Sequence, residues 1–455
     1  MNSTCMLLMK KVLIIWVTIF LLSGIAFAVS EVSFNDVNRP QSAILFIVDG
    51  FGSSYYYPEF KALSLDGSEL PKANTRNLIS GTRILNIKTS QPVTGIAHSI
   101  IVTGYSGANE EIVGYPEATI YDITRQHGFS NLAVMETGDF SNMREEQDII
   151  LFMENNSIDE PQLSLQAKAA PSGVYELMND WKMKLPEYLN KRAGVERYSA
   201  YNKWGIDAAN AVAESMIKNH PAQKFFLTLN VGAIDSGGHN LGEDDYVSLI
   251  EDLDRDFYPL YKTASENRIA IFFTADHGMS FAKKDAQRGG HSSDKYSSRQ
   301  ESLRIPFVIF SPNSRVGVVS GEYDQEDIAP TILNVLDLPN HLQYADGGSI
   351  KIKNYASIFV KADNKYQVSL WNDGQKLSER GDSELIFAGL PLNTSYTLKA
   401  SGAEIAYEEH IFLDSDKNLN FYRKESVFNY NRIFAIILIL IVMAAGFIVI
   451  RKMKD

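Results

Sequence analysis

Short apolar runs alternate with amphipathic, helix-like stretches along most of the chain. The runs are rich in β-branched and aromatic residues, which favours buried strands. They are Ala43–Val48, Leu132–Met135, Phe225–Asn230, Ile269–Thr274 and Pro306–Phe310. Stretches such as "GIDAANAVAESMIKN" and "DDYVSLIEDLDRDFYPLYKTASE" lie between them and have helical periodicity. This alternation predicts an α/β fold: a three-layer α/β/α sandwich around a mainly parallel sheet.

The same pattern predicts the domain organisation. The alternation extends over residues 40–350, which we expect to form the main domain, with residues 150–200 inserted as a helical cap. From residue 353 to residue 425 the chain changes to short alternating runs such as "YQVSLWND" and "TSYTLKA", with turn residues between them. That change predicts a small C-terminal β-sandwich.

Both ends of the chain are strongly apolar. Residues 1–28 combine a basic start, an apolar stretch and a small-x-small ending, which predicts a signal peptide, with an uncleaved anchor as the alternative. Residues 433–450 carry no charge and are followed by a basic tail, which predicts a single transmembrane helix with a short cytoplasmic C-terminal tail. We therefore expect a single-pass protein of the cell membrane whose main domain is extracytoplasmic.

Charge and cysteine content narrow the classes of partner. The formal net charge is −12, which repels polyanions, so we expect no nucleic-acid polymer as a partner. A small phosphate compound can still bind where local cations override the overall field. The single cysteine, Cys5, lies in the expected signal peptide, so the mature protein would contain no disulfide.

Candidate ligand residues follow three of the predicted strands. Asp49, Asp235 and Asp276 each come within a few residues of a strand end. Open α/β sheets build their sites at the carboxyl ends of parallel strands, so these side chains are expected to meet. His277 is adjacent to Asp276, and His239 is four residues after Asp235. Because the intervening Ser-Gly-Gly is a poor helix former, we expect a loop to carry Asp235 and His239.

Carboxylate and imidazole ligands together suit zinc or manganese. Taken singly, each candidate has a simpler explanation, such as a turn aspartate, a helix-capping threonine or a loop histidine. Their joint occurrence is what predicts a site for two divalent ions rather than one. The candidate metal ligands are Asp49, Thr94, Asp235, His239, Asp276, His277 and His291.

Four motifs resemble the alkaline phosphatase superfamily over roughly residues 40–345. "FIVDGFG" resembles the first metal-binding aspartate segment of that family, and "TGIAHSIIVTG" resembles its nucleophile segment. "DSGGHNLG" and "TADHGM" are similar to its two remaining ligand motifs. The short interval from Asp276-His277 to His291 is similar to the cofactor-independent phosphoglycerate mutases and the ethanolamine phosphate transferases.

The resemblance implies a ligand set and a mechanism. One ion would be bound by Asp235, His239 and His291; the other would be bound by the remaining candidates, Asp49, Thr94, Asp276 and His277. Thr94 would be the catalytic nucleophile, forming a covalent phosphorylated or phosphodiester-linked intermediate. The implied activity is hydrolysis of a phosphodiester or phosphomonoester, with zinc as the expected metal and manganese as the alternative. The implied substrate is a small phosphate ester or a lipid or glycan head group.

The chain also departs from the family pattern. Phosphodiesterase members carry an asparagine where Tyr115 stands here. The Cys/Ser-x-Pro-x-Arg pattern that sulfatases modify is missing around Thr94, so sulfatase activity is not expected. No motif places an arginine as a phosphate clamp, and Arg288 is merely near His291 in sequence.

Two other functions remain open on the sequence. A transferase that moves a phosphoryl-alcohol group, such as phosphoethanolamine, onto a surface glycan or lipid would use the same site. A non-catalytic surface binding module would keep the fold without the metals.

Overall fold

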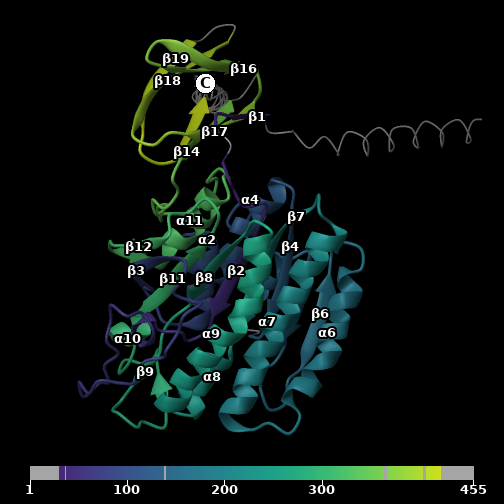
Figure 1. Cartoon of the computed structure of the whole chain (residues 1–455), viewed down its shortest axis with the longest axis vertical. Coiled ribbons are helices and arrows are strands. Elements are labelled where there is room, and N and C mark those ends of the chain that lie inside the picture. The colour runs from purple at the N-terminus through teal and green to yellow at the C-terminus, as the bar shows by residue number, and fades with distance from the viewer. Residues whose placement is uncertain (1–29, 36, 138–139, 363–365, 403–405, 422–455) are drawn as a thin grey trace, which may run out of the picture.

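The computed structural model describes residues 30–421, apart from residues 36, 138–139, 363–365 and 403–405. These residues form a large α/β body and a smaller all-β unit that lies at one end of it (Figure 1). Each has its own apolar core, which the two buried clusters of hydrophobic side chains define.

One long sheet forms the centre of the body. Its strand order is β12-β3-β11-β8-β2-β7-β4-β5-β6, and the short β13 (Tyr323–Asp324) also pairs with β3. The strands in that order are Gly317–Val319, Thr82–Lys88, Arg304–Phe310, Ile269–Ala275, Ser42–Val48, Lys224–Val231, Phe129–Met135, Ile149–Met153 and Leu163–Ala167. The central strands β8, β2, β7, β4 and β5 run parallel, whereas β11 and β6 pair antiparallel with their neighbours. The sheet is therefore mixed, with a parallel centre.

The central strands are apolar along their whole length because both of their faces are covered. Every residue of β2 and of β8 is buried. Full burial of an Ile, Leu or Phe side chain stabilises the fold by about 1.5–3 kcal/mol, so these strands are the most strongly determined part of the fold. All five strands expected from the sequence are present, each extended by one to three residues.

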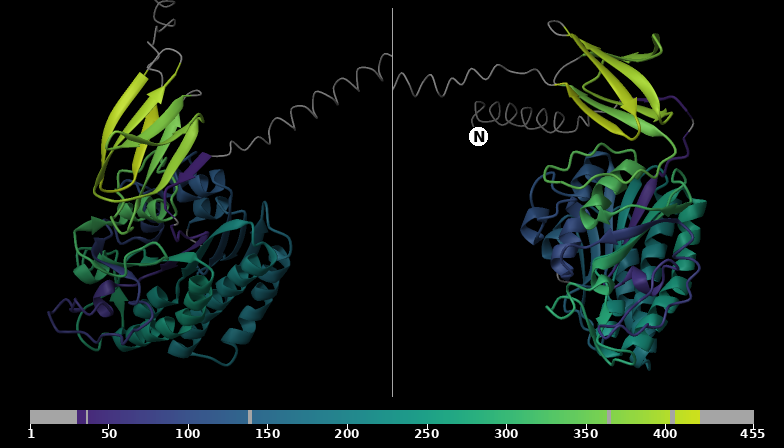
Figure 2. Two further views of the ribbon diagram at one scale, coloured as in Figure 1. Left: turned by 45° about the horizontal axis from the view of Figure 1, so that its top comes forward. Right: turned by 90° about the vertical axis from the view of Figure 1, so that its left-hand side faces the viewer.

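Helices cover both faces of the sheet, as expected for an α/β/α sandwich (Figure 2). The long helices α7 (Gly194–Asn219) and α9 (Glu243–Glu266) pack against β7 and β8, and α6 (Val174–Leu189) packs on α7. On the opposite face lie helices that include α2, α4 and α11, which are Thr94–Thr103, Ile120–Gln126 and Ile328–Val335. The shorter helical elements are η1 (Ser53–Tyr55), α3 (Glu110–Val113), α5 (Ser141–Glu145), α8 (Ala233–Asn240), α10 (Gln300–Leu303) and η2 (Gln325–Asp327).

Residues 150–200 differ from the expected helical cap. They contribute β5 and β6, which extend the main sheet to its edge, and α6, which lies against α7. The physical reason is that β5 is apolar on both faces, so it buries more apolar surface as a strand within the sheet than it would in a cap above it. This segment therefore belongs to the three layers.

The all-β unit consists of two four-stranded sheets, ordered β1-β17-β14-β20 and β16-β15-β18-β19. The strands β14 to β20 are Ala356–Ala362, Gln367–Asn372, Gln375–Arg380, Glu384–Leu390, Thr394–Ser401, Ala406–Leu413 and Lys417–Phe421. The N-terminal strand β1 (Ser30–Ser33) pairs parallel with β17, a pairing that the sequence pattern did not indicate. In Figure 1 this unit lies at the opposite end of the body from α8 and β9.

The structure does not support the membrane anchor that was expected from the apolar ends of the chain. Among the described residues, no helix is long and apolar enough to cross a membrane. Residues 433–450 and the expected signal peptide, residues 1–28, lie outside the described part of the chain. The transmembrane helix is therefore unsupported, and the single-pass membrane localisation, with its outer domain and cytoplasmic tail, is withdrawn with it.

Candidate metal centre

Asp49 and Asp276 come together because their strands are neighbours. β2 and β8 pair in parallel with Val48 opposite Ala275, so the next residue of each strand lies at the same edge. Asp49 is 4% exposed and Asp276 is fully buried. The backbone N–H of Gly50 donates to Asp276 Oδ1 over 3.0 Å, which ties the two strand ends together.

His277 reaches the same edge because the chain turns as it leaves β8. The His277 N–H donates to Asp276 Oδ1 over 2.7 Å, and this bond stabilises the turn. Gly278 follows, and a Cβ there would lie 2.0 Å from the carbonyl oxygen of Glu301. Only glycine allows this approach of the two backbones. His277 Nε2 consequently lies 3.3 Å from Asp276 Oδ2 and 3.5 Å from Asp49 Oδ1.

Asp235 and His239 lie on a helix, which corrects the predicted loop. They occupy α8 (Ala233–Asn240), where a spacing of four residues puts them on one face, with His239 Nε2 3.5 Å from Asp235 Oδ1. The glycines between them have low helix propensity, but Gly237 is buried, and a Cβ there would lie 2.3 Å from Leu249 Cδ1 of α9. Close packing of α8 on α9 therefore outweighs the local preference.

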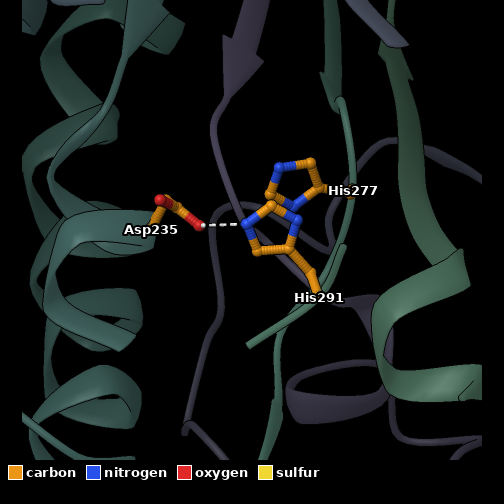
Figure 3. Close-up of side chains that lie close together, drawn as sticks. All are labelled: Asp235, His277 and His291. Carbon is orange, nitrogen blue, oxygen red and sulfur yellow. Dashed lines mark ion pairs between the residues drawn. The ribbon is translucent and has the colours of Figure 1, made fainter. Parts of the chain in front are cut away.

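His291 enters from the other side of the centre. It follows β10 (Gly289–Gly290), which pairs with β9 (Ser280–Phe281). Its Nε2 lies 3.1 Å from His239 Nε2 and 3.6 Å from Asp235 Oδ1. Figure 3 shows its ring lying against that of His277; the two rings are nearly parallel with centroids 3.7 Å apart.

The protonation of these histidines can be deduced from their hydrogen bonds. The Nδ1 atoms of His239, His277 and His291 each lie within 3.2 Å of a backbone carbonyl, those of Gly289, Gly278 and Pro92. A carbonyl can only accept, so each Nδ1 carries a proton and each Nε2 is directed inward. Burial lowers the pKa of His277 and His291, which keeps both rings neutral.

This arrangement fits a divalent cation. The Nε2 atoms of His239 and His291 lie 3.1 Å apart, and a positive ion beside them could bind both. Asp235 Oδ1 and Asp276 Oδ2 are buried and accept no hydrogen bond, although buried carboxylate oxygens are normally satisfied. Carbonyl-bonded histidines and carboxylates are the usual surroundings of zinc and similar metals.

Two groups of side chains have the separations that a metal ion requires. Asp235, His277 and His291 form one group, and Asp49, Asp276 and His277 form the other, each with ligand atoms within 4.8 Å of one another. His277 therefore lies between the two groups. The assignment expected from the sequence differs. It placed His277 only with Asp49, Thr94 and Asp276, and it placed His239 with Asp235 and His291.

Thr94 faces this centre from the start of α2. The N-cap of the helix is Val93, and no side chain caps it, so Thr94 is the first helical residue rather than a cap. Its hydroxyl oxygen lies 3.3 Å from His277 Nε2. The structure thus brings all seven predicted site residues to one edge of the sheet.

His98 is a neighbour of the centre that was not among the predicted site residues. It is fully buried, its Nδ1 lies 2.9 Å from the Thr94 carbonyl, and its Nε2 lies 3.2 Å from Asn230 Nδ2. Its Nδ1 is also 3.6 Å from Asp276 Oδ2, and its ring stacks on Phe140. The spacing of four residues from Thr94 on one helix face was the available signal. His98 holds the start of α2 against the end of β8.

A cavity of about 90 Å³ lies beside Thr94. Besides the site residues Asp49, Thr94 and Asp235, it is lined by Glu136, Thr137, Asn156, Ile158, Tyr201, Gly232 and Ser236. Glu136 is 1% exposed, and burial raises its pKa well above the ordinary value. Sequence reasoning missed this group because its members come from four separate places: the residues after β4, the β5–β6 connection, α7 and the start of α8. Tyr115, by contrast, donates a hydrogen bond to Glu111 and packs near Tyr344.

The chain is similar to several known proteins. A sequence model of the sulfatase family matches residues 244–338. Two 2,3-bisphosphoglycerate-independent phosphoglycerate mutases are similar: that of Mycoplasmopsis pulmonis is 30% identical over 34% of this chain and 29% of its own length. The mutase of Mycoplasmoides gallisepticum is 23% identical over 52% of this chain and 41% of its own length. The chain thus spans less than half of the length of these relatives.

Solved structures with a similar arrangement include two hydrolases. Alkaline phosphatase PafA is 14% identical with a TM-score of 0.48, covering 70% of this chain and 99% of its own. A phosphonate monoester hydrolase from Silicibacter pomeroyi is 15% identical with a TM-score of 0.41, covering 82% and 88%.

The fold and the centre define an α/β protein whose sheet edge gathers residues that could hold divalent metal ions. The sulfatase match and the mutase relatives belong to one superfamily, whose motifs this chain carries at the positions just described. These findings support the assignment of the chain to the alkaline phosphatase superfamily.

Proposed function

We propose that the protein is a metal-dependent hydrolase of phosphoric esters, in which the hydroxyl of Thr94 is the nucleophile. The observation that carries the proposal is the position of Thr94 Oγ1, 3.3 Å from His277 Nε2 at the start of α2. A hydroxyl among converging carboxylates and imidazoles is the arrangement that nucleophilic catalysis with metal assistance requires. The superfamily to which the chain is assigned supports a hydrolase in general.

The match to the sulfatase family does not extend to the nucleophile. It covers residues 244–338, which contain Asp276, His277 and His291 but not Thr94. Thr94 lacks both the residue type and the flanking proline and arginine that sulfatase modification needs. We therefore propose phosphorus rather than sulfur as the principal centre of attack.

In this proposal two divalent ions, zinc or manganese, are bound by the two groups of ligands. Asp49, Asp276, His277 and Thr94 would hold one, and Asp235, His239 and His291 would hold the other. Bound divalent ions lower the pKa of a nearby hydroxyl and neutralise charge on phosphoryl oxygens. His277 also lies within reach of Asp235 and His291, which keeps the two positions adjacent.

The residues of the chain then act in order. Thr94 Oγ1 forms a bond to phosphorus as the bond from phosphorus to the ester oxygen breaks on the opposite side, and the proton lost from Thr94 ends on the departing alcohol. The product is a phosphorylated or phosphodiester-linked Thr94, which water then cleaves to regenerate the hydroxyl and release the phosphate product. The backbone N–H groups at the start of α2 stabilise negative charge on the phosphoryl oxygens. His98 keeps this helix end in place through its contact with the Thr94 carbonyl.

The experiment that tests the proposal compares Thr94→Ala and Thr94→Ser with the wild type. The full chain would be treated with a chelator and then supplied with zinc or manganese, and hydrolysis of chromogenic phosphate esters would be followed. Thr94→Ala should lose nearly all turnover while its metal content and thermal unfolding temperature stay close to wild type. Thr94→Ser, which keeps the hydroxyl, should retain a measurable rate.

A different result would change the mechanism. If Thr94→Ala kept more than about a tenth of the wild-type rate, a metal-activated water would be the attacking group instead. If the wild-type protein bound neither metal at micromolar concentrations, the non-catalytic alternative would replace the hydrolase.

A further inference from the structure

Tyr246 connects α9 to the turn that follows β2, although it was not among the predicted site residues. It lies near the start of α9 and is fully buried. Its hydroxyl donates to the carbonyl of Gly50 over 2.7 Å and accepts the N–H of Gly52 over 3.1 Å. One side chain therefore satisfies both a backbone acceptor and a backbone donor of the turn over residues 50–52.

That turn lies against candidate ligands of both metal groups. Asp49 immediately precedes it, and the Gly50 N–H donates to Asp276 Oδ1 over 3.0 Å. Gly50 has a φ of 71°, and a Cβ there would lie 2.6 Å from the Cβ of Asp235, so the turn approaches α8 as closely as only glycine allows. A displacement of the turn would therefore move Asp49 and change its separation from Asp235.

The ring of Tyr246 is itself held in place. It packs edge-on against Tyr55, with centroids 5.0 Å apart, and against Phe281, with centroids 5.6 Å apart. Because buried side chains are close-packed, the ring cannot shift without disturbing these neighbours, and its hydroxyl has a fixed position. The helix that carries Tyr246 also packs on α8, which carries Asp235. The turn and α8 are thus supported by the same helix.

We propose that Tyr246 is a positioning residue of the metal centre, whose hydroxyl fixes the turn over residues 50–52 and thereby the place of Asp49 relative to Asp235. The proposal rests on the two-metal arrangement of the proposed function and adds to it a residue that binds neither metal nor substrate. Groups that orient metal ligands typically contribute about 10–100-fold to metal affinity or activity.

The two ions should depend on Tyr246 to different extents. Asp49 adjoins the turn and Asp276 accepts a hydrogen bond from it, whereas Asp235 is oriented by its own helix. Loss of the Tyr246 hydroxyl should therefore weaken the binding of one equivalent of metal and spare the other. A general loss of packing would not distinguish between the two.

The first test measures zinc binding by equilibrium dialysis for the full chain and two variants, Tyr246→Phe and Tyr121→Phe. Tyr121 is the matched control: it is fully buried in α4, on the opposite face of the sheet from α9, and its hydroxyl lies 3.0 Å from Thr228 Oγ1. Both variants lose one hydroxyl and keep the ring, so the general cost of the change is similar. Tyr246→Phe should bind one equivalent of zinc at least about tenfold more weakly than wild type and the other within about threefold.

Tyr121→Phe should bind both equivalents as the wild type does. Unchanged affinity for both equivalents in Tyr246→Phe, or an equal weakening of both, would overturn the proposal. The same pattern of weakening in the control would also overturn it, and so would a wild-type chain that binds no zinc.

Backbone hydrogen exchange provides a measurement that needs no metal. In the chelated protein, the amide of Gly52 should exchange at least about tenfold faster in Tyr246→Phe than in the wild type, because its hydrogen-bond acceptor is gone. Tyr121→Phe should leave that amide unchanged. Equal exchange in Tyr246→Phe and the wild type would show that the turn does not depend on the hydroxyl, which would overturn the proposal.

Kinetics separate positioning from substrate binding. With a chromogenic phosphate ester, Tyr246→Phe should lower kcat by about tenfold or more and leave KM within about threefold of wild type, since Tyr246 touches no substrate. A higher KM at unchanged kcat would assign Tyr246 to substrate binding and overturn the positioning role.

The proposed function and this inference fail in different ways. If zinc binding depends on Tyr246 as described but no ester is hydrolysed, the hydrolase is wrong and the positioning role stands. If hydrolysis depends on Thr94 while Tyr246→Phe leaves zinc binding and exchange unchanged, the function stands and the positioning role is lost.

Discussion

Two clusters of buried charge can be compared within this molecule, one at the metal centre and one where the body meets the β-sandwich. The second cluster is centred on Lys353, whose Nζ lies 2.6 Å from Asp337 Oδ1 and 2.8 Å from Asp416 Oδ2. Tyr355 and Ser357 add hydroxyl donors to Asp337, and the Ser357 N–H donates to Asp416 Oδ1 over 2.8 Å. Every carboxylate oxygen of this junction cluster has a partner.

The metal centre is the opposite case. Its members Asp49, Asp276 and His277 are about as buried, yet Asp235 Oδ1 and Asp276 Oδ2 accept no hydrogen bond and the Nε2 atoms of two imidazoles face one another. A buried ion pair that serves the fold is completed by the chain itself, because an unpaired buried charge costs several kcal/mol. A buried cluster whose carboxylate oxygens accept no hydrogen bond from the chain is expected to bind a partner that the chain does not supply, such as a metal ion. The difference in hydrogen bonding, rather than in burial, separates a binding site from a structural ion pair.

The largest expected effect comes from Asp276→Asn. With zinc or manganese present, this variant should lose more than about a hundredfold in kcat, because it weakens a ligand of one ion. In the chelated protein it should be as stable as wild type or more stable by about 1–3 kcal/mol. Asparagine keeps the Oδ1 acceptor used by Gly50 and His277 and removes an uncompensated charge. Chemical denaturation with and without chelator measures the stability of the metal-loaded and the chelated protein. A chelated variant less stable than the chelated wild type would contradict the interpretation of the centre as incomplete.

Lys353→Met should act on the other cluster. Removing the shared cation leaves Asp337 and Asp416 buried together without compensation, and we expect a loss of about 3–5 kcal/mol in the free energy of unfolding. Metal content should not change, since the junction lies far from the centre (Figure 1). The matched control is Lys351→Met, because Lys351 is 62% exposed and pairs with Asp414 on the surface. The control should lose less than about 1 kcal/mol. A similar loss in both variants would show that the buried network adds no particular stability.

The smallest effect is expected for Tyr355→Phe. This change removes one hydroxyl donor to Asp337 but leaves the pair with Lys353 intact, so we expect a loss of about 1–2 kcal/mol. Denaturant titration gives the value directly. If the loss equalled that of Lys353→Met, the hydroxyl and not the cation would be the main partner of Asp337.

Much of the body could be predicted from the sequence because its strands are buried on both faces. A continuous apolar run such as that of β2 has few alternatives, and an aspartate directly after it must lie at the sheet edge. The helix α8 could not be predicted, because Gly237 has a low helix propensity and is selected by its contact with Leu249, a residue of a different helix. The edge strand β6 and the parallel pairing of β1 with β17 also depend on partners distant in the sequence.

The sequence by itself determined the chemistry of the site: which residues carry oxygen and nitrogen ligands, and that Thr94 carries the hydroxyl. These are properties of residue type and of position after a strand, and both are local. The tertiary structure alone decided that His277 lies between two ligand groups, that three Nδ1 atoms are bound to carbonyls, and that no described lysine or arginine lines the cavity beside Thr94. Those features are distances between segments far apart in the chain, and long-range packing sets them.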